Sequence, residues 1–397
     1  MTNPEIKPTS RVFWQIGVAA LGRLFLNTAR RFSYPFAPAL SRGMGVSLTA
    51  VTSLIAINQV TGVLGLLFGP LADRWGYRSM MLAGLSLLTL GMLTGGIFPF
   101  YGSVLMALFL AGLGKTMFDP ALQAFIGKQI PYERRGKVIG IVEISWAGSS
   151  LVGIPLIGLL IGLFGWRAPF LALGGLGVLS TFGFGMLTPG ARKNVPVHPQ
   201  PLHFFKSWRQ LALERSALGA LCFAFFIAVA NDNLFVVYGA WLEQRFQLNI
   251  VDLGIATTVI GVAELIGDGL TASLADRFTL KRSVLVGLIL SGASYAALPY
   301  LRNSLSFALS GLFIIYLTFE FTIVSSMSLF TEFLPEARAT MMAGFFAASS
   351  IGRVCGALIG GLVWEAGGIM ATAMASAFIS GLGLISLFLG IRHWRPN

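Results

Sequence analysis

Charged residues are scarce in this chain. Asp, Glu, Lys and Arg make up 11% of its 397 residues, whereas soluble domains carry about 25%. So little charge cannot cover a globule of this size with polar surface, which excludes a soluble enzyme, a disordered chain and a nucleic-acid-binding protein. The two cysteines allow at most one disulfide, so no disulfide framework is implied.

Residues for catalysis and metal binding are equally few. The three histidines, His198, His203 and His393, lack metal-ligand spacing. The sequence contains no Gly-x-x-x-x-Gly-Lys-Ser/Thr phosphate loop, so we do not expect this chain alone to drive transport with ATP. No nucleophile–base constellation is present either. We therefore expect no enzyme activity, no cofactor and no metal site.

Hydrophobic residues, by contrast, make up 55% of the chain. They gather in runs of about 20 residues, the length that a membrane-spanning helix needs. Twelve such runs are centred near Leu26, Ile57, Leu88, Leu113, Leu151, Leu179, Ile227, Ile260, Leu290, Phe313, Cys355 and Ile379. The sequence therefore predicts an all-α, multi-pass membrane protein with twelve transmembrane helices, whose surroundings are the lipid bilayer.

Lys and Arg residues are distributed unevenly between the loops. If the N-terminus lies inside, nineteen of the 28 fall in inner loops, four in outer loops and five within helices. Positive charge marks cytoplasmic loops, so both termini are predicted to be cytoplasmic, in the cell (inner) membrane. This topology explains the net charge of +12 without nucleic acid as a partner.

The sequence also repeats itself at an offset of 203 or 204 residues. The segment 69–78 returns in altered form at 272–281, and 131–140 returns at 335–344. The offset also relates Asn27 to Asn231 and Tyr34 to Tyr238. Such parallel repeats predict two pseudo-symmetric six-helix halves with a substrate site between them near the midplane. The halves are residues 1–190 and 215–397, joined by a cytoplasmic linker over residues 191–214.

Within the first repeated segment, Gly69, Leu71, Ala72, Asp73, Arg74, Gly76 and Arg78 resemble the loop signature of the major facilitator superfamily, Gly-x-Leu-Ala-Asp-Arg-x-Gly-Arg-Lys. The resemblance covers the whole chain and implies the major facilitator fold. It also implies a gating role for Gly69, Asp73, Arg74, Gly76, Arg78, Arg134 and Asp276. The alternative is that this loop only fixes the topology.

Two further motifs bear on the type of transport. The fifth predicted helix resembles the glycine-rich antiporter motif of drug and sugar exporters, with Gly153-Ile154-Pro155 in place of a Gly-Pro pair. The fourth helix lacks the arginine that this family carries ahead of a Gly-x-Gly, and Lys115 follows its glycines instead. The resemblance thus implies a proton antiporter that exports its substrate.

Eleven ionisable residues lie within the predicted spans. Each costs about 2.5–3.5 kcal/mol at the centre of a membrane helix, so most must face a wet cavity or one another. They are Arg23, Arg30, Arg31, Lys115, Asp119, Glu143, Asp232, Glu264, Asp268, Glu320 and Arg353.

Helical spacing divides these residues. Arg23, Asn27, Arg30 and Tyr34 share one face of the first helix, although Arg23 could instead reach the cytoplasmic edge. Arg31 is rotated about 100° from Arg30 and faces either the cavity or a partner on a neighbouring helix, such as Glu143. Glu143 could equally neutralise Arg30 or Lys115. Lys115 and Asp119 are spaced as a self-neutralising pair or as part of the transport site. The predicted substrate-binding residues are Asn27, Arg30, Tyr34, Lys115, Asn231, Tyr238 and Tyr316.

Acidic residues dominate the second half. Carboxylates in a low dielectric are candidates to bind and release a proton. The predicted proton-coupling residues of the whole chain are Asp119, Glu143, Asp232, Glu264 and Glu320. Asp268 serves either coupling or packing, and Arg353 could offset one of these acids. Proton binding at Asp232 or Glu320 is the hypothesis for what drives the rearrangement of the two halves.

The sequence therefore favours a proton-coupled secondary transporter that exports a small organic molecule by alternating access. One alternative is uptake of an organic anion by symport, suggested by Arg30 and Lys115. The other is a sensor or scaffold that transports nothing, which the cost of eleven intramembrane charges argues against.

Overall fold

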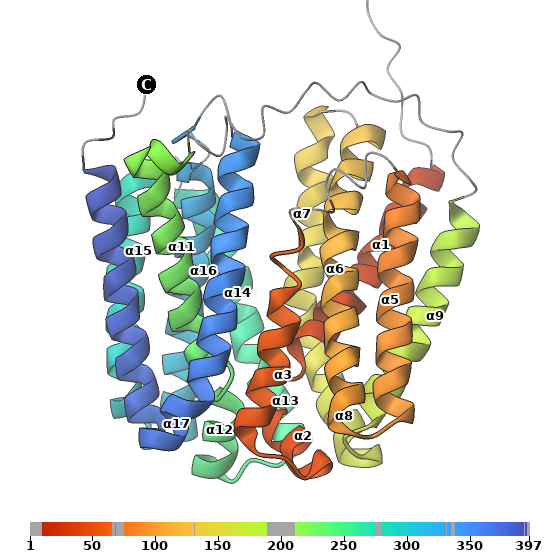
Figure 1. Cartoon of the computed structure of the whole chain (residues 1–397), viewed down its shortest axis with the longest axis horizontal. Helices are drawn as coiled ribbons and strands as arrows, with labels where there is room; N and C mark the ends of the chain where they lie inside the picture. The colour runs from red at the N-terminus through yellow and green to blue at the C-terminus, as the bar shows by residue number, and fades with distance from the viewer. Residues whose placement is uncertain are drawn as a thin grey trace, which may run out of the picture. The chain divides into compact units, whose positions relative to one another are not determined.

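The computed structural model describes residues 10–65, 68, 75–130, 132–188, 211–274, 280–330, 332–334, 338–392 and 394. Over these residues the chain is helical and contains no β-strand (Figure 1). Most of the predicted linker, residues 191–210, lies outside the described part.

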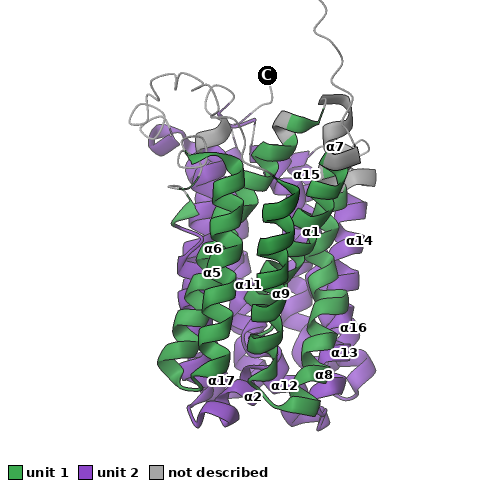
Figure 2. Cartoon of the chain, turned by 90° about the vertical axis from the view of Figure 1, so that its right-hand side faces the viewer, with its two compact units in different colours: residues 1–32, 64–199 green, residues 33–63, 200–397 purple. Residues whose placement is uncertain are grey.

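By packing, the chain divides into two compact units (Figure 2). Unit 1 comprises Met1–Phe32 and Leu64–Pro199, and unit 2 comprises Ser33–Val63 and Gln200–Asn397. Residues 33–63 thus belong to unit 2, although they precede most of unit 1 in the sequence. The predicted halves, which follow the sequence repeat rather than the packing, stay a prediction.

Unit 1 is a bundle in which α5 packs against α6 and α9, and α1 packs against α6, α7 and α9. Its elements are α1 (Ser10–Arg31), α5 (Tyr77–Ile97), α6 (Tyr101–Gln129), α7 (Tyr132–Gly148), the π-helical turn η1 (Ser149–Gly153), α8 (Ile154–Phe164) and α9 (Ala168–Leu187).

Unit 2 is a second bundle, in which α11 and α3 pack against the long α17, and α16 packs against α14 and α15. Its elements are α2 (Ala37–Met44), α3 (Leu48–Val60), α11 (Arg215–Phe235), α12 (Tyr238–Phe246), α13 (Ile250–Ala256), α14 (Thr258–Leu274), α15 (Leu280–Ala297), the 3₁₀ turn η2 (Leu298–Leu301), α16 (Leu305–Phe330) and α17 (Arg338–Ile391).

Local sequence sets several helix ends. The Ser47 side chain accepts a hydrogen bond from the Ala50 amide at the start of α3, and Asn249 caps α13 in the same way. Gly45 ends α2 with φ of 67°, a left-handed conformation that favours glycine.

Each of the twelve predicted centres lies in a helical segment of the structure. Nine described helices are long and apolar enough to cross a membrane, or ten if α2 and α3, bent by 115°, form one span. In this number α17 is counted as a single helix, although its 54 residues would extend about 80 Å if straight. That length is more than twice the thickness of the hydrocarbon core of a bilayer. Non-helical backbone at Gly367 and Gly368 divides α17, so its two arms account for two predicted spans. α1, which contains the predicted centre Leu26, is not among these helices.

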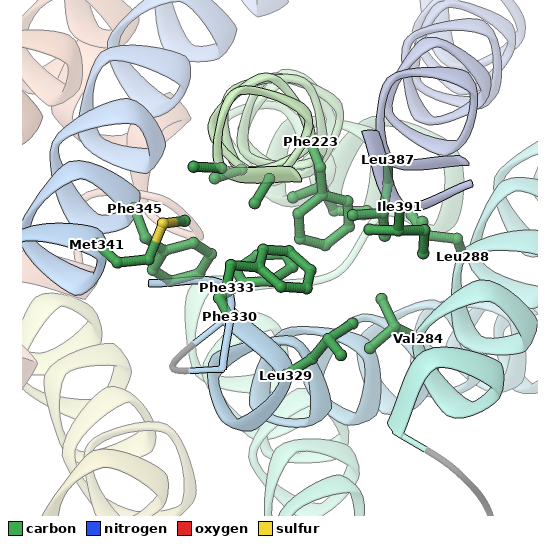
Figure 3. Close-up of a cluster of buried hydrophobic side chains, with 14 of the residues drawn as sticks. Phe223, Val284, Leu288, Leu329, Phe330, Phe333, Met341, Phe345, Leu387 and Ile391 are labelled. Atoms are coloured by element: carbon green, nitrogen blue, oxygen red, sulfur yellow. The ribbon is translucent and has the colours of Figure 1, made fainter. Parts of the chain in front are cut away.

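An apolar cluster fills the interior of unit 2. Side chains from α11, α15, α16 and α17 point toward one another there (Figure 3). The Phe330 ring lies 5.5 Å from the ring of Phe223, 5.3 Å from that of Phe333 and 5.6 Å from that of Phe345. Such edge-on and tilted pairs stabilise a core beyond the burial of their area.

Candidate functional site

Buried charged side chains from α1, α6 and α7 meet in unit 1. The guanidinium of Arg23 lies 3.0 Å from Asp119 Oδ1 and 2.9 Å from Glu143 Oε2. Lys115 Nζ donates to Asp119 Oδ2 at 2.5 Å and to Asn27 Oδ1 at 2.6 Å. We call these five residues the charged network. It contains two cations and two carboxylates, which offset the cost of burying charge.

Helical geometry explains how the network assembles. Arg23 and Asn27 are one turn apart on α1, and Lys115 and Asp119 are one turn apart on α6, so each pair shares a face. The self-neutralising pair considered from the sequence is therefore present. Arg23 is 6% exposed, a buried position rather than the cytoplasmic edge that the sequence left open.

Exposure differs among the acids of the network. The Glu143 side chain is 42% exposed and that of Asp119 is 23% exposed. Asp119 is also held by two cations, whereas Glu143 is paired with Arg23. Glu143 is thus the more exposed of the two acids in the network.

Trp146 is a part of this site that the sequence did not reveal. The Arg31 guanidinium lies 4.4 Å from the Trp146 ring centroid and Lys115 Nζ lies 5.4 Å from it, both within cation–π range. The expected partner of Arg31, Glu143, pairs with Arg23 instead. Arg30, on the same helix, is half-buried. A tryptophan one turn beyond Glu143 on α7 is the signal that could have pointed to this contact.

A second polar group lies in unit 2 around Asp232, which is fully buried. Its Oδ1 accepts a hydrogen bond from the Tyr34 hydroxyl at 2.9 Å, and Arg353 Nη1 lies 3.8 Å from Oδ2. Gln59 Nε2 in turn donates to the Tyr34 oxygen at 2.6 Å. Gln59 escaped the sequence analysis, although an amide inside an apolar run is a detectable signal.

Close helix packing brings these groups together. A Cβ atom at Gly356 would lie 2.7 Å from the Val229 carbonyl oxygen and 3.0 Å from Asp232 Cβ. A larger residue there would push α17 away from α11. Gly356 therefore keeps Arg353, one turn earlier on α17, within reach of the carboxylate.

Aromatic rings surround the Asp232 group. The Phe235 ring lies 4.3 Å from the ring of Tyr34, 5.3 Å from that of Tyr238 and 5.4 Å from that of Tyr316. The Tyr238 hydroxyl also lies 3.1 Å from Thr257 Oγ1. Three of the predicted substrate-binding tyrosines thus lie in one aromatic cluster.

The remaining predicted residues of unit 2 lie on α11, α14 and α16. Asn231 and Glu264 are buried, at 4% and 5% exposure. Glu320 is half-buried, and a Cβ atom at Gly267 of α14 would lie 2.9 Å from its Cβ. Among the described residues, no three His, Cys, Asp or Glu side chains converge as a metal site would require.

Most of the predicted gating residues fall outside the described part. This applies to Gly69, Asp73, Arg74 and Asp276, and to the side chain of Arg134. Gly76 precedes α5 with φ of 85°, a value that favours glycine.

Arg78 joins the start of α5 to the end of α9. It donates to Thr188 Oγ1 and to the Gly185 carbonyl oxygen, each at 3.2 Å. In unit 2, Lys281 donates to the Ile391 carbonyl oxygen at 2.9 Å. Lys281 lies 203 residues after Arg78, and Ile391 lies 203 residues after Thr188. The sequence repeat is therefore also a structural repeat.

The sequence model of the Major Facilitator Superfamily matches residues 19–236 and again residues 220–397. The chain belongs to the major facilitator superfamily. The predicted family and its all-α membrane fold are thereby confirmed. This major facilitator is a multi-pass membrane transporter, and it is not an enzyme.

Two relatives and one solved structure illustrate the match. The inner membrane transport protein YdhP of Escherichia coli (strain K12) is 25% identical over 384 residues, 94% of this chain and 95% of YdhP. The multi-drug resistance efflux pump PmrA homolog of Lactococcus lactis subsp. lactis (strain IL1403) is 24% identical, over 89% of this chain and 90% of the homolog.

The solved structure is the inward-facing, unoccupied crystal structure of a bacterial homolog to the human lysosomal transporter Spinster. It matches with a TM-score of 0.82 and 16% identity, over 98% of this chain and 100% of that chain. At this identity the match supports the fold alone.

Proposed function

We propose that this major facilitator is a proton-coupled secondary transporter that exports a small organic molecule by alternating access. The observation that carries the proposal is the sharing of Arg23 between Asp119 and Glu143, at 3.0 and 2.9 Å. Ionisable groups are costly within a membrane and mark ion or substrate paths. The similarity to an efflux pump in Lactococcus lactis supports export.

The charged network suggests how a proton would act. When Glu143 takes up a proton, its charge-assisted bond with Arg23 weakens, because such bonds are roughly twice as strong as neutral ones. The guanidinium then bonds mainly to Asp119, which Lys115 also holds. Proton binding at an exposed acid would thus redistribute the contacts of α1, α6 and α7.

Substrate binding is assigned in the same proposal to polar groups beside these acids. In unit 1 they are Asn27, Arg30 and Lys115, and in unit 2 they are Asn231, Tyr238 and Tyr316. Tyr34 also belongs to this set, and its hydroxyl donates to Asp232. The proposed topology keeps both termini cytoplasmic in the inner membrane, with halves 1–190 and 215–397.

Proton coupling is testable in two steps. A thermal-shift screen of metabolites and drugs at two pH values first finds a ligand. Proteoliposomes loaded with a pH-sensitive dye then record proton movement when that ligand is added. We expect at least one of the variants Glu143→Gln and Asp232→Asn to abolish transport driven by a pH gradient. If both variants, and Glu320→Gln as well, transport normally under the gradient, proton coupling through these acids is wrong.

Uptake of an organic anion is the second candidate, favoured by the cations Arg31 and Lys115 beside Trp146. The direction of transport separates the two. In inside-out vesicles with an acidic interior, an antiporter accumulates the ligand in exchange for protons that leave. A symporter instead moves preloaded ligand outward together with those protons.

A further inference from the structure

Residues 33–63, here called the clasp, continue the chain directly from α1 of unit 1 but lie in unit 2 (Figure 2). Within the clasp, α3 packs along α17. A Cβ atom at Gly361 of α17 would lie 2.8 Å from Thr52 Oγ1, so the two helices touch closely at this point.

Polar contacts attach the clasp to the helices of unit 2, and three of them can be compared by their exposure. Two involve exposed groups, since Arg42 pairs with Glu243 at 2.6 Å with its side chain 57% exposed, and the Thr49 hydroxyl donates to an exposed Glu365. The third is the hydrogen bond from Tyr34 to Asp232, which is buried on both sides. It is therefore the contact most sensitive to the charge of its acceptor.

Hydrogen-bond direction fixes the role of Tyr34. Because Gln59 donates to the Tyr34 oxygen, the phenolic proton is left to point at Asp232. An ionised Asp232 accepts this proton in a charge-assisted bond, and a protonated Asp232 accepts it more weakly.

Other groups also face Asp232 from the surrounding helices. Arg353 of α17 lies 3.8 Å from its Oδ2. Tyr295 of α15 and Tyr316 of α16 interact with it electrostatically, and Glu264 of α14 interacts with Tyr316. The contacts of Asp232 with Arg353 and Tyr34 both weaken when the carboxylate loses its charge.

We propose that Tyr34 is a positioning residue through which the charge of Asp232 controls the attachment of the clasp. An ionised Asp232 keeps the clasp on unit 2, and a protonated Asp232 releases it. Because Phe32 and Ser33 join the clasp to α1, its release is a movement that α1 would share. This inference rests on the proposed function, since it takes Asp232 to be a proton-coupling acid.

A cysteine at position 52 reports on the clasp. Thr52 is fully buried, so Thr52→Cys reacts with a membrane-impermeant maleimide only when the clasp leaves unit 2. The native cysteines are first removed by Cys222→Ala and Cys355→Ala. Rates at pH 5.5 and pH 8 are divided by those of Asn303→Cys, an exposed position of the same unit, which corrects for the pH dependence of thiol reactivity.

We expect corrected labelling to be about tenfold faster at pH 5.5 than at pH 8, from the difference between a charged and a neutral acceptor. Tyr34→Phe and Asp232→Asn should each label quickly at both pH values. Arg42→Gln, which weakens an exposed contact of the same clasp, should raise both rates and keep their ratio.

The inference is wrong if Tyr34→Phe or Asp232→Asn retains the tenfold ratio, or if the parent shows none. Either variant alone decides the matter should the other fail to fold. Gradient-driven transport without an effect of pH on labelling would refute the role of the clasp and leave proton coupling standing. A pH effect on labelling without gradient-driven transport would refute proton coupling alone.

Discussion

Unit 1 and unit 2 place opposite chemistry at positions that the 204-residue offset relates. Arg23 and Lys115 belong to the charged network of unit 1, whereas their counterparts Ile227 and Phe319 belong to the apolar cluster of unit 2. The frame around them is nevertheless shared. The hydrogen bonds from Arg78 and Lys281 join corresponding helices of the two bundles, α5 to α9 in unit 1 and α15 to α17 in unit 2.

This difference bears on why the charges are present. Unit 2 builds the corresponding helices with Ile227 and Phe319 packed in its core, so the frame does not require charge at these positions. The four ionised side chains of unit 1 also cost free energy to bury. The shared frame therefore does not require the charged network, which agrees with the role in transport proposed for it.

Among these changes, placing an arginine at Ile227, the counterpart of Arg23, should change the free energy of unfolding most. Ile227→Arg would bury a cation among apolar side chains that offer it no partner within the cluster. We expect a loss of about 5 kcal/mol in the free energy of unfolding, the upper end for an unpaired buried charge. The yield of monodisperse protein and denaturant unfolding in micelles measure this.

The counterpart of Asp119 supplies the control, because Ile323 packs against the same cluster. Ile227→Arg combined with Ile323→Asp recreates the unit 1 pair and should recover part of the loss. A double variant as unstable as the single one would mean that the two bundles differ in more than these side chains.

The reverse exchange should have a smaller effect. Arg23→Ile leaves Asp119 paired with Lys115, and Glu143 is already partly exposed. We therefore expect a loss of about 3 kcal/mol in the free energy of unfolding, the lower end for breaking a buried pair. Thermal unfolding would measure it, with Arg23→Lys as the control that keeps the charge. No change on Arg23→Ile would contradict the buried pairing of Arg23 with Asp119 and Glu143.

Local patterns account for what the sequence predicted well. Apolar runs identify the spans because burying a backbone in lipid requires helices, and even the divided α17 corresponds to two separate runs. The Lys115–Asp119 pair follows from one turn of one helix. The repeat was visible because its motifs return at an offset of 203 or 204 residues.

Contacts between distant segments were not predictable in the same way. Glu143 pairs with Arg23 and not with Arg31, and this depends on how α7 packs against α1. Tyr34 matches Tyr238 by offset, yet its hydroxyl bonds to Asp232, because residues 33–63 pack with unit 2. Helical spacing shows which residues share a face of one helix, but it does not show which other helix packs against that face.

The smallest expected effect tests the shared frame. Arg78→Ala removes two hydrogen bonds to the end of α9, and Lys281→Ala removes one to the end of α17. Because both donors are only half-buried, we expect about 1 kcal/mol for each change, with Arg78→Ala the larger. Hydrogen exchange of the last turn of α9 and of α17 would show which helix end loosens. Since each tie lies within its own bundle, each variant should loosen only its own helix end, and loosening of both by one variant would show that the two frames are not independent.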